Sequence, residues 1–214
     1  SINKLEGFAN VDSTRGEFVL RDCDFKYLES AIKARGFSVD IVIAGCSFDS
    51  IVDDCIGRYY DNLSESWHSL KLYDSRFSYV FANVVAGGEV KNTPLLEVKK
   101  CLFEKCYYGF VGNSAEMIFS KSTFKDTRYD AISIGCDDLC QAKIYMDSCH
   151  IFNTGRYGFE NYLDGSETYV TNCEFRGSGQ ENIILTRLYY TDKYSKLHIE
   201  NNIFGSVENG GVGV

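Results

Sequence analysis

The sequence has 214 residues, of which 44% are hydrophobic and 24% charged, so it can bury one sizeable core and is not a disordered chain. Its 22 Lys and Arg against 30 Asp and Glu give a formal net charge of −8 and a pI near 4.9, which argues against nucleic acid and anionic membranes as partners. No apolar run is long enough to span a bilayer, and residues 1–7 lack the pattern of a signal peptide. Three counts stand out: 9 Cys, 1 Pro, and 15 each of Phe and Tyr.

A short polar signature that ends in an aromatic anchor recurs along the whole chain. The eight anchors are Phe25, Phe48, Phe77, Phe103, Phe124, Phe152, Phe175 and Phe204. Their mean spacing of about 26 residues lies in the range of solenoid repeats. A second apolar residue follows each anchor after a turn-rich stretch; in chain order these residues are Ile32, Ile56, Val84, Phe110, Ile132, Phe159, Ile183 and Val212. The pattern predicts coils of short strands and turns, with little helix.

The cysteines fit this repeat as core residues. Strand alternation places the residue two before each anchor on the inward face, and this position reads Cys23, Cys46, Ser75, Cys101, Ser122, His150, Cys173 and Asn202. An odd cysteine count leaves at least one free thiol, so we expect synthesis in a reducing compartment, the cytoplasm, or a place in a phage or virus particle. Neither Cys101 with Cys106 nor Cys136 with Cys140 has the spacing of a good zinc knuckle.

This pattern resembles the right-handed parallel β-helix superfamily, the pectate-lyase-like solenoids, over nearly the whole chain. The resemblance implies an all-β solenoid of about eight coils forming one domain, residues 1–214. It implies little about chemistry, because the superfamily includes polysaccharide lyases, hydrolases, epimerases, phage tailspikes and non-catalytic modules. Stacked strands also explain why proline is nearly absent, since it would remove a ladder hydrogen bond.

The two ends of the repeat array indicate whether another domain or subunit contacts this solenoid. No capping helix is found, and residues 210–214 fall inside the second strand of the eighth coil. Because solenoids shield their last coil, we expect a fragment of a longer protein or an end covered by a partner. A homotrimer and an end-to-end contact with another domain both fit this expectation.

The turn after the anchor is the best candidate for a site. Counting from the anchors places Tyr108, Tyr129 and Tyr157 in one outward column, beside Tyr107, Arg128 and Arg156. Acidic and amide residues follow at nearby positions: Asp130, Gln180, Glu181 and Asn182. Tyrosine rings pack against pyranose rings, while arginine, acid and amide groups bind hydroxyls or uronate carboxylates. We therefore predict a glycan partner, with Tyr107, Tyr108, Tyr129, Tyr157, Gln180 and Asn182 as substrate-binding residues.

Catalysis is left open by the sequence. The resemblance to the superfamily's lyases implies Arg128 or Arg156 as the base, with Asp130 or Glu181 holding Ca²⁺; no other cofactor and no fixed metal is expected. A hydrolase would need paired carboxylates, such as Asp130 with Glu181, Asp53 with Asp54, or Asp137 with Asp138. Residues 157–159 (Tyr-Gly-Phe) resemble the C5-epimerases of alginate, but Glu160 and Asn161 depart from the Asp, Pro and His that follow there.

Two further features leave the function class open. Longer coils place extra residues at 58–67, 136–140 and 188–194, consistent with the wall of a sugar cleft or with a subunit contact. The alternative to a glycan module is a non-catalytic structural or interaction solenoid, such as a phage tail-fibre or tailspike shaft or an assembly scaffold.

Overall fold

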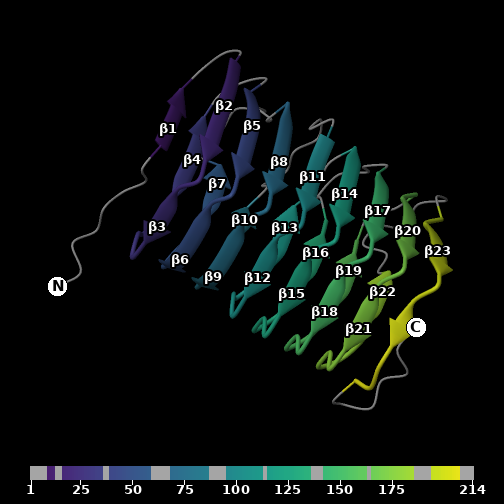
Figure 1. Ribbon diagram of the computed structural model, residues 1–214. Coiled ribbons are helices and arrows are strands. Elements are labelled where there is room, and N and C mark those ends of the chain that lie inside the picture. The colour runs from purple at the N-terminus through teal and green to yellow at the C-terminus, as the bar shows by residue number, and fades with distance from the viewer. Residues whose placement is uncertain are drawn as a thin grey trace.

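The protein is a parallel β-solenoid (Figure 1). The structure, a computed structural model, describes residues 9–12, 16–35, 39–58, 68–86, 95–112, 115–135, 142–162, 165–185 and 194–207. Over these ranges the regular elements are 24 strands, arranged in three parallel sheets of eight. None of the described segments forms a helix that could cross a membrane.

Sheets A, B and C each take every third strand along the chain. Sheet A consists of β1 (Ala9–Asp12), β4 (Ile32–Arg35), β7 (Ile56–Arg58), β10 (Val85–Ala86), β13 (Phe110–Gly112), β16 (Ile132–Ile134), β19 (Phe159–Asn161) and β22 (Ile183–Leu185). Sheet B consists of β2 (Gly16–Arg21), β5 (Val39–Ala44), β8 (Ser69–Tyr73), β11 (Leu95–Lys99), β14 (Glu116–Ser120), β17 (Lys143–Asp147), β20 (Glu167–Thr171) and β23 (Lys196–Glu200). Sheet C consists of β3 (Asp24–Lys26), β6 (Ser47–Ile51), β9 (Arg76–Val80), β12 (Leu102–Glu104), β15 (Thr123–Lys125), β18 (His150–Phe152), β21 (Glu174–Arg176) and β24 (Ile203–Phe204). The eight sequence repeats are therefore eight successive coils, each running from sheet B through sheet C towards sheet A.

The interior is a set of ladders, as the repeat predicts. Rings of the aromatic anchors stack from coil to coil: the centroids of Phe48 and Phe77 are 5.0 Å apart with planes 2° apart, and those of Phe103 and Phe124 are 4.4 Å apart. Full burial of a side chain of this size contributes about 1.5–3 kcal/mol. Since the rings of the first five coils contact one another in sequence, the ladder aligns the coils as well as stabilising them.

The corner between sheets B and C explains the inward cysteines and serines. A residue with positive φ turns the chain at this corner, as at Lys100 (φ 55°) and Lys121 (φ 51°), and the next side chain points inward. Ser122 Oγ accepts a hydrogen bond from the backbone N–H of Cys101 at 3.1 Å and donates one to Ser120 O at 3.0 Å. The inward residue thus satisfies backbone groups that the bend removes from the sheet.

The sixth repeat differs from the prediction by one residue. Ile151, not Phe152, is in register with Phe124 and Phe175, and Cys149, not His150, is the buried inward residue before it. Phe152 and His150 lie on the outer face, where their rings are 5.8 Å apart. The prediction was wrong because it chose the aromatic residue, whereas strand alternation after the bend at Ser148 (φ 54°) fixes which side chains point inward.

Two smaller predictions from the repeat also need comment. In the third coil Val85, rather than Val84, occupies the sheet A ladder opposite Ile56, although both valines are fully buried. Val212 and Pro94 lie outside the described residues.

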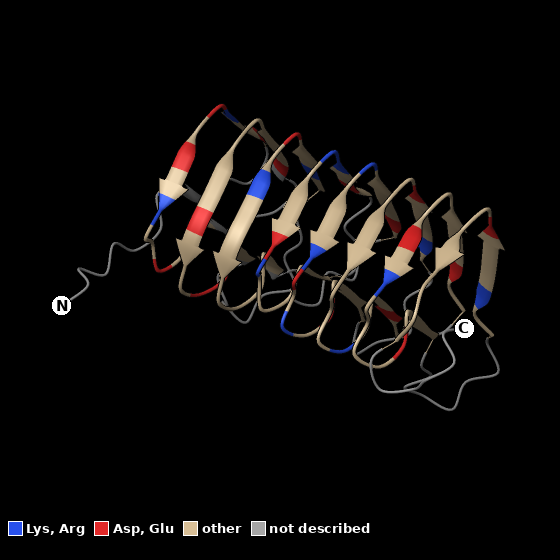
Figure 2. Ribbon diagram, turned by 60° about the horizontal axis from the view of Figure 1, so that its bottom comes forward, with Lys and Arg blue, Asp and Glu red and all other residues tan. Residues whose placement is uncertain are grey.

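The outer face of sheet C carries alternating charges (Figure 2). Glu104 is contacted by Arg76 at 2.9 Å and by Lys125 at 3.0 Å, and Glu174 pairs with Arg176 at 2.5 Å. The two pairs of Glu104 join neighbouring coils, whereas the Glu174–Arg176 pair lies within β21; opposite charges alternate along this face. They are side chains of a solvated face, where each pair contributes at most about 1 kcal/mol.

Candidate functional site: the turn between sheets C and A

The predicted site residues gather at the corner where sheet C turns into sheet A. Tyr107 and Tyr108 lie between β12 and β13, and the next coil contributes Arg128, Tyr129 and Asp130 between β15 and β16. Arg156 and Tyr157 follow in the sixth coil, and Gln180, Glu181 and Asn182 in the seventh. Parallel stacking brings these turns together although they are more than 20 residues apart in sequence.

Three of the predicted tyrosines form one ring cluster. The ring centroids of Tyr107 and Tyr129 are 4.6 Å apart, and those of Tyr108 and Tyr129 are 5.3 Å apart with planes at 21°. The guanidinium of Arg128, which is exposed, lies over the Tyr107 ring at 5.3 Å. These three rings, which we call the tyrosine cluster, are half-buried.

Tyr157 is not a member of the tyrosine cluster. Because the sixth anchor is Ile151, Tyr157 lines up with Asp130, whose neighbour Ala131 donates its N–H to Tyr157 O at 3.1 Å. The side chain of Arg156 covers the Tyr157 ring instead, at 4.6 Å. The predicted column of three tyrosines is therefore a cluster of Tyr107, Tyr108 and Tyr129 with Tyr157 beside it.

Arg156 is held by two buried carboxylates. Its Nε donates to Asp130 Oδ1 at 2.9 Å and its Nη2 to Asp130 Oδ2 at 2.5 Å, in a bidentate pair. Nη2 also donates to Glu160 Oε2 at 3.0 Å. The side chains of Asp130 and Glu160 are 0% and 1% exposed, whereas that of Arg156 is 32% exposed. This acid–arginine network therefore seals both acids beneath a single cation that reaches the surface.

The other contacts of the network come from Ser133 on β16 and from Tyr157 and Tyr162, which lie before and after β19. Ser133 on β16 donates its hydroxyl to Glu160 Oε2 at 3.1 Å, and Tyr162 OH donates to Glu160 Oε1. Tyr157 N donates to Asp130 Oδ1 at 3.0 Å. Burial raises the pKa of Glu160, and the charge of Asp130 adds to this effect. The Asp130 hydrogen bonds raise the pKa of Arg156, so the guanidinium keeps its charge.

Glu160, Ser133 and Tyr162 were not among the predicted site residues. Ser133 and Glu160 are in register on the outer face of sheet A, and their strands β16 and β19 are adjacent. An alignment of the middle residues of these three-residue strands would have identified both Ser133 and Glu160. Glu160 lies four residues after Arg156, but only stacking brings Asp130 and Ser133 of the coil before to the same two side chains.

The remaining predicted residues occupy different environments. Gln180 is exposed and Glu181 half-buried, so both reach the surface beside Tyr157. Asn182 does not, because it is fully buried, accepts a hydrogen bond from Ser178 Oγ at 3.0 Å and donates one to Gly205 O at 3.2 Å. The surface available to a ligand thus comprises the tyrosine cluster, Arg128, one edge of Arg156, Tyr157, Gln180 and Glu181.

The arrangement has consequences for each catalytic prediction. Asp130 is paired with Glu160 through Arg156 and not with Glu181, and neither buried acid meets solvent in this conformation. Asp54 is engaged in accepting from the backbone and side-chain nitrogens of Asn83. Among the described residues, no group of three or more His, Cys, Asp or Glu side chains could hold a metal ion. Asp137, Asp138 and the Cys136–Cys140 pair lie outside the described residues, as do nearly all of the three long insertions.

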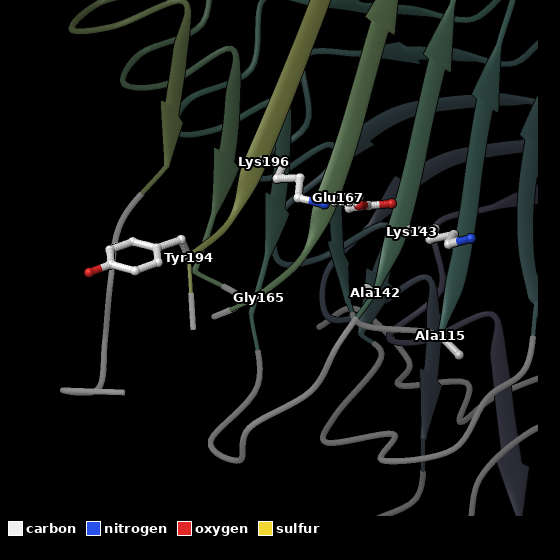
Figure 3. Close-up of a pocket in the computed structure, with 7 residues that line it drawn as sticks. All are labelled: Ala115, Ala142, Lys143, Gly165, Glu167, Tyr194 and Lys196. Atoms are coloured by element: carbon white, nitrogen blue, oxygen red, sulfur yellow. Dashed lines mark hydrogen bonds and ion pairs between the residues drawn. The ribbon is translucent and has the colours of Figure 1, made fainter. Parts of the chain in front are cut away.

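A separate hollow opens at another corner, where the chain enters sheet B (Figure 3). Its volume is about 550 Å³, and Lys143, Glu167, Lys196 and Tyr194 contribute to its lining. Lys196 Nζ contacts Glu167 Oε1 at 2.7 Å, and both side chains come from the strands of sheet B that border the hollow. Glu167 and Lys196 are the first residues of β20 and β23, and their pair is part of the solvated exterior of sheet B.

Comparison with known proteins identifies the class of this molecule. A parallel solenoid of three-sheet coils is the architecture of a β-helix, and the family model described as "right handed beta helix region" matches residues 84–214. Because the match covers more than half of the chain, the chain belongs to the right-handed β-helix family. No curated protein and no solved structure gives a match.

Proposed function

We propose that this β-helix is a carbohydrate-binding module, which holds a glycan against the turn between sheets C and A. The observation that carries the proposal is the tyrosine cluster with Arg128 beside it. Rings at 4.6 and 5.3 Å form an apolar platform, and the exposed guanidinium and the phenol groups supply hydrogen bonds at its margin. Apolar sugar faces and hydroxyl rims match this combination.

Rigidity of the platform supports the same function. Burial, together with the charge of Asp130, raises the pKa of Tyr108, so its hydroxyl stays protonated and can donate. The neighbouring turn is locked by the acid–arginine network, and Tyr129 N donates to Tyr107 O at 2.9 Å across the coils. A preformed surface loses little conformational entropy when it binds a ligand, which favours affinity.

A more specific proposal is that the protein cleaves or epimerises the polysaccharide, but the geometry of the turn favours binding alone. A lyase would use Arg128 or Arg156 as the base and a hydrolase would use a carboxylate pair. Arg156 is held charged by Asp130 and Glu160 and cannot act as a base, and both acids are buried, so Arg128 and Glu181 are the groups more readily available for chemistry. We therefore place glycan binding first and cleavage or epimerisation second.

A non-catalytic structural or interaction solenoid, such as a tail-fibre shaft or scaffold, is the second candidate. The observation in its favour is the same burial of Asp130 and Glu160, because a network that is fully satisfied inside the protein also serves stability alone. This candidate predicts that ring removal at the turn has no effect on any glycan.

Retention on a panel of immobilised polysaccharides tests the proposal. The double variant Arg128→Ala/Tyr129→Ala should lose retention while keeping the wild-type circular dichroism spectrum. Arg156 is a poor choice for this test, because its removal leaves two buried acids unpaired. Tyr194→Ala is the matched control, since this tyrosine is 81% exposed at another corner. Equal retention of the double variant and the wild type would refute the proposal, as would a wild type that retains no polysaccharide.

A further inference from the structure

The outer face of sheet B differs in composition from the charged outer face of sheet C. Each strand of sheet B contributes three outward side chains, and parallel register aligns these into three columns along the solenoid. Apart from one lysine and one glutamate, the central column is apolar or aromatic. In chain order it reads Val19, Val42, Lys71, Glu97, Ile118, Tyr145, Tyr169 and His198.

The central column is ordered but not covered. The ring centroids of Tyr145 and Tyr169 are 5.2 Å apart with planes at 11°, and those of Tyr169 and His198 are 4.5 Å apart with planes at 6°. The two tyrosines are half-buried, His198 is exposed, and Val19 is 41% exposed. A continuous apolar seam in the middle of a sheet face, with polar groups on both sides, is typical of a protein interface.

The two outer columns of sheet B carry complementary charges. Three strands have opposite charges at their first and last outward positions: Glu17 with Arg21 on β2, Lys143 with Asp147 on β17, and Lys196 with Glu200 on β23. In none of the eight described strands of this sheet do the two positions carry like charges. The first column reads Glu17, Asp40, Ser69, Leu95, Glu116, Lys143, Glu167 and Lys196, and the last column reads Arg21, Ala44, Tyr73, Lys99, Ser120, Asp147, Thr171 and Glu200. Three of the charged first-column residues are labelled in Figure 3.

This pattern makes the face complementary to itself. A two-fold axis that lies between two such faces, parallel to the solenoid, brings each coil against the same coil of a second copy. It places the central column against itself and the first column against the last. Lys143 of one copy then faces Asp147 of the other, and each such contact occurs twice, as in other isologous interfaces.

We propose that the protein forms a symmetric dimer in which the outer faces of sheet B pack together, with the two solenoids side by side and pointing the same way. A five-residue strand is about 17 Å long and eight coils span about 38 Å. The contact therefore covers about 650 Å² on each copy and roughly 1,300 Å² in total, which is enough for a specific interface. The inference does not depend on glycan binding, because the turn between sheets C and A is not part of this face.

Charge also distinguishes this arrangement from its reverse. If the two solenoids pointed in opposite directions with their faces fully overlapped, the second coil would meet the seventh, and Asp40 would face Glu167 of the other copy. In the proposed arrangement Lys71 and Glu97 each face their own counterpart. These two residues are in register on adjacent strands, so each lysine has glutamates beside it in both copies, and this offsets the repulsion.

Sedimentation velocity and light scattering test for the dimer, whose mass should be twice the chain's 24.2 kDa. Arg21→Glu places an acid opposite Glu17 at two symmetric positions and should weaken the dimer roughly 10-fold. The exchange Glu17→Arg/Arg21→Glu should restore the wild-type affinity. Lys26→Glu, which makes the same charge change at an exposed position on sheet C, is the matched control and should have no effect.

Cross-linking tests the orientation of the two copies. Because residue 19 meets its own counterpart across the axis, a short bismaleimide should join two chains of Val19→Cys. Wild type and Lys26→Cys, which control for the native cysteines and for random collisions, should not be joined. A monomer or a trimer at about 100 µM overturns the proposal, as does a dimer that Arg21→Glu leaves unchanged. A dimer whose Val19→Cys chains are not joined overturns the parallel arrangement.

Discussion

Removal of Arg156 should destabilise the protein strongly. In Arg156→Ala the carboxylate of Asp130 keeps one backbone donor, Tyr157 N, and Glu160 keeps two hydroxyl donors, but neither acid retains a cation among these contacts. Breaking a buried ion pair on one side costs about 3–5 kcal/mol. Because Arg156 is 32% exposed and water can enter the gap, we expect the lower end, about 3 kcal/mol.

Urea unfolding followed by tyrosine and tryptophan fluorescence measures this loss. The triple variant Arg156→Met/Asp130→Asn/Glu160→Gln removes the charges together and should regain most of the stability, since neutral groups of similar volume avoid a buried charge. If Arg156→Ala unfolds within about 0.5 kcal/mol of the wild type, the two acids do not depend on the guanidinium and the interpretation of the network is refuted.

The same network predicts a dependence of stability on pH. The pKa of Glu160 is raised in the folded state, whereas an unfolded glutamate titrates near about 4.3. The folded state therefore binds this proton more tightly, so its contribution to stability is full below pH about 4.3 and is lost as the pH rises through the raised pKa. Glu160→Gln should flatten the curve in this window; a variant with the wild-type profile would contradict the assignment.

Three further predictions concern the coil interior and its turns. Ser122→Ala leaves the buried N–H of Cys101 without its acceptor and should lower the free energy of unfolding in urea by about 1–3 kcal/mol. Ser122→Cys, which introduces the residue found at this position in other coils, should lower it less. Equal losses would show that the hydroxyl acceptor is irrelevant. A Cβ at Gly155 would lie 1.9 Å from the carbonyl oxygen of Arg128 in the coil before, whereas the nearest contact of a Cβ at Gly135 is a side chain at 3.3 Å. Gly155→Ala should therefore lower the free energy of unfolding by about 1–3 kcal/mol more than Gly135→Ala. Similar urea midpoints for the two variants would refute this. Burial raises the pKa of Cys101 and Cys106 to about 12. Neither thiol should therefore be alkylated at pH 8 until the protein unfolds. Rapid alkylation of these cysteines in the native protein would disprove their burial.

Much of the scaffold is predictable because its signal is local and repeated. An anchor such as Phe48 or Phe77 points inward from its strand, and the residue two before it points inward from the adjoining corner, so the pattern survives without knowledge of neighbouring coils. The sixth coil marks the limit of this reasoning. There Ile151 replaces an aromatic residue and Phe152 follows it, and only the bend at Ser148 decides which of the two points inward.

The grouping of the candidate residues was predictable, but their geometry was not. Counting from anchors brought them to one turn, as the structure also places them, but a one-residue error in the sixth coil moved Tyr157 into the wrong column. Glu160 was not predicted although it lies only four residues after Arg156, because its burial depends on β19 stacking against β16 and on Asp130 from the coil before.

The sequence by itself determined the coil repeat, the inward ladders and the all-β solenoid, because side-chain alternation along a short strand needs no tertiary information. Only the tertiary structure decided that Asp130 and Glu160 share one arginine and that Tyr107, Tyr108 and Tyr129 form one ring cluster. The physical reason is the variable length of the turns: stacking aligns coils by backbone hydrogen bonds, and contacts between neighbouring turns follow from that alignment and not from their separation in sequence.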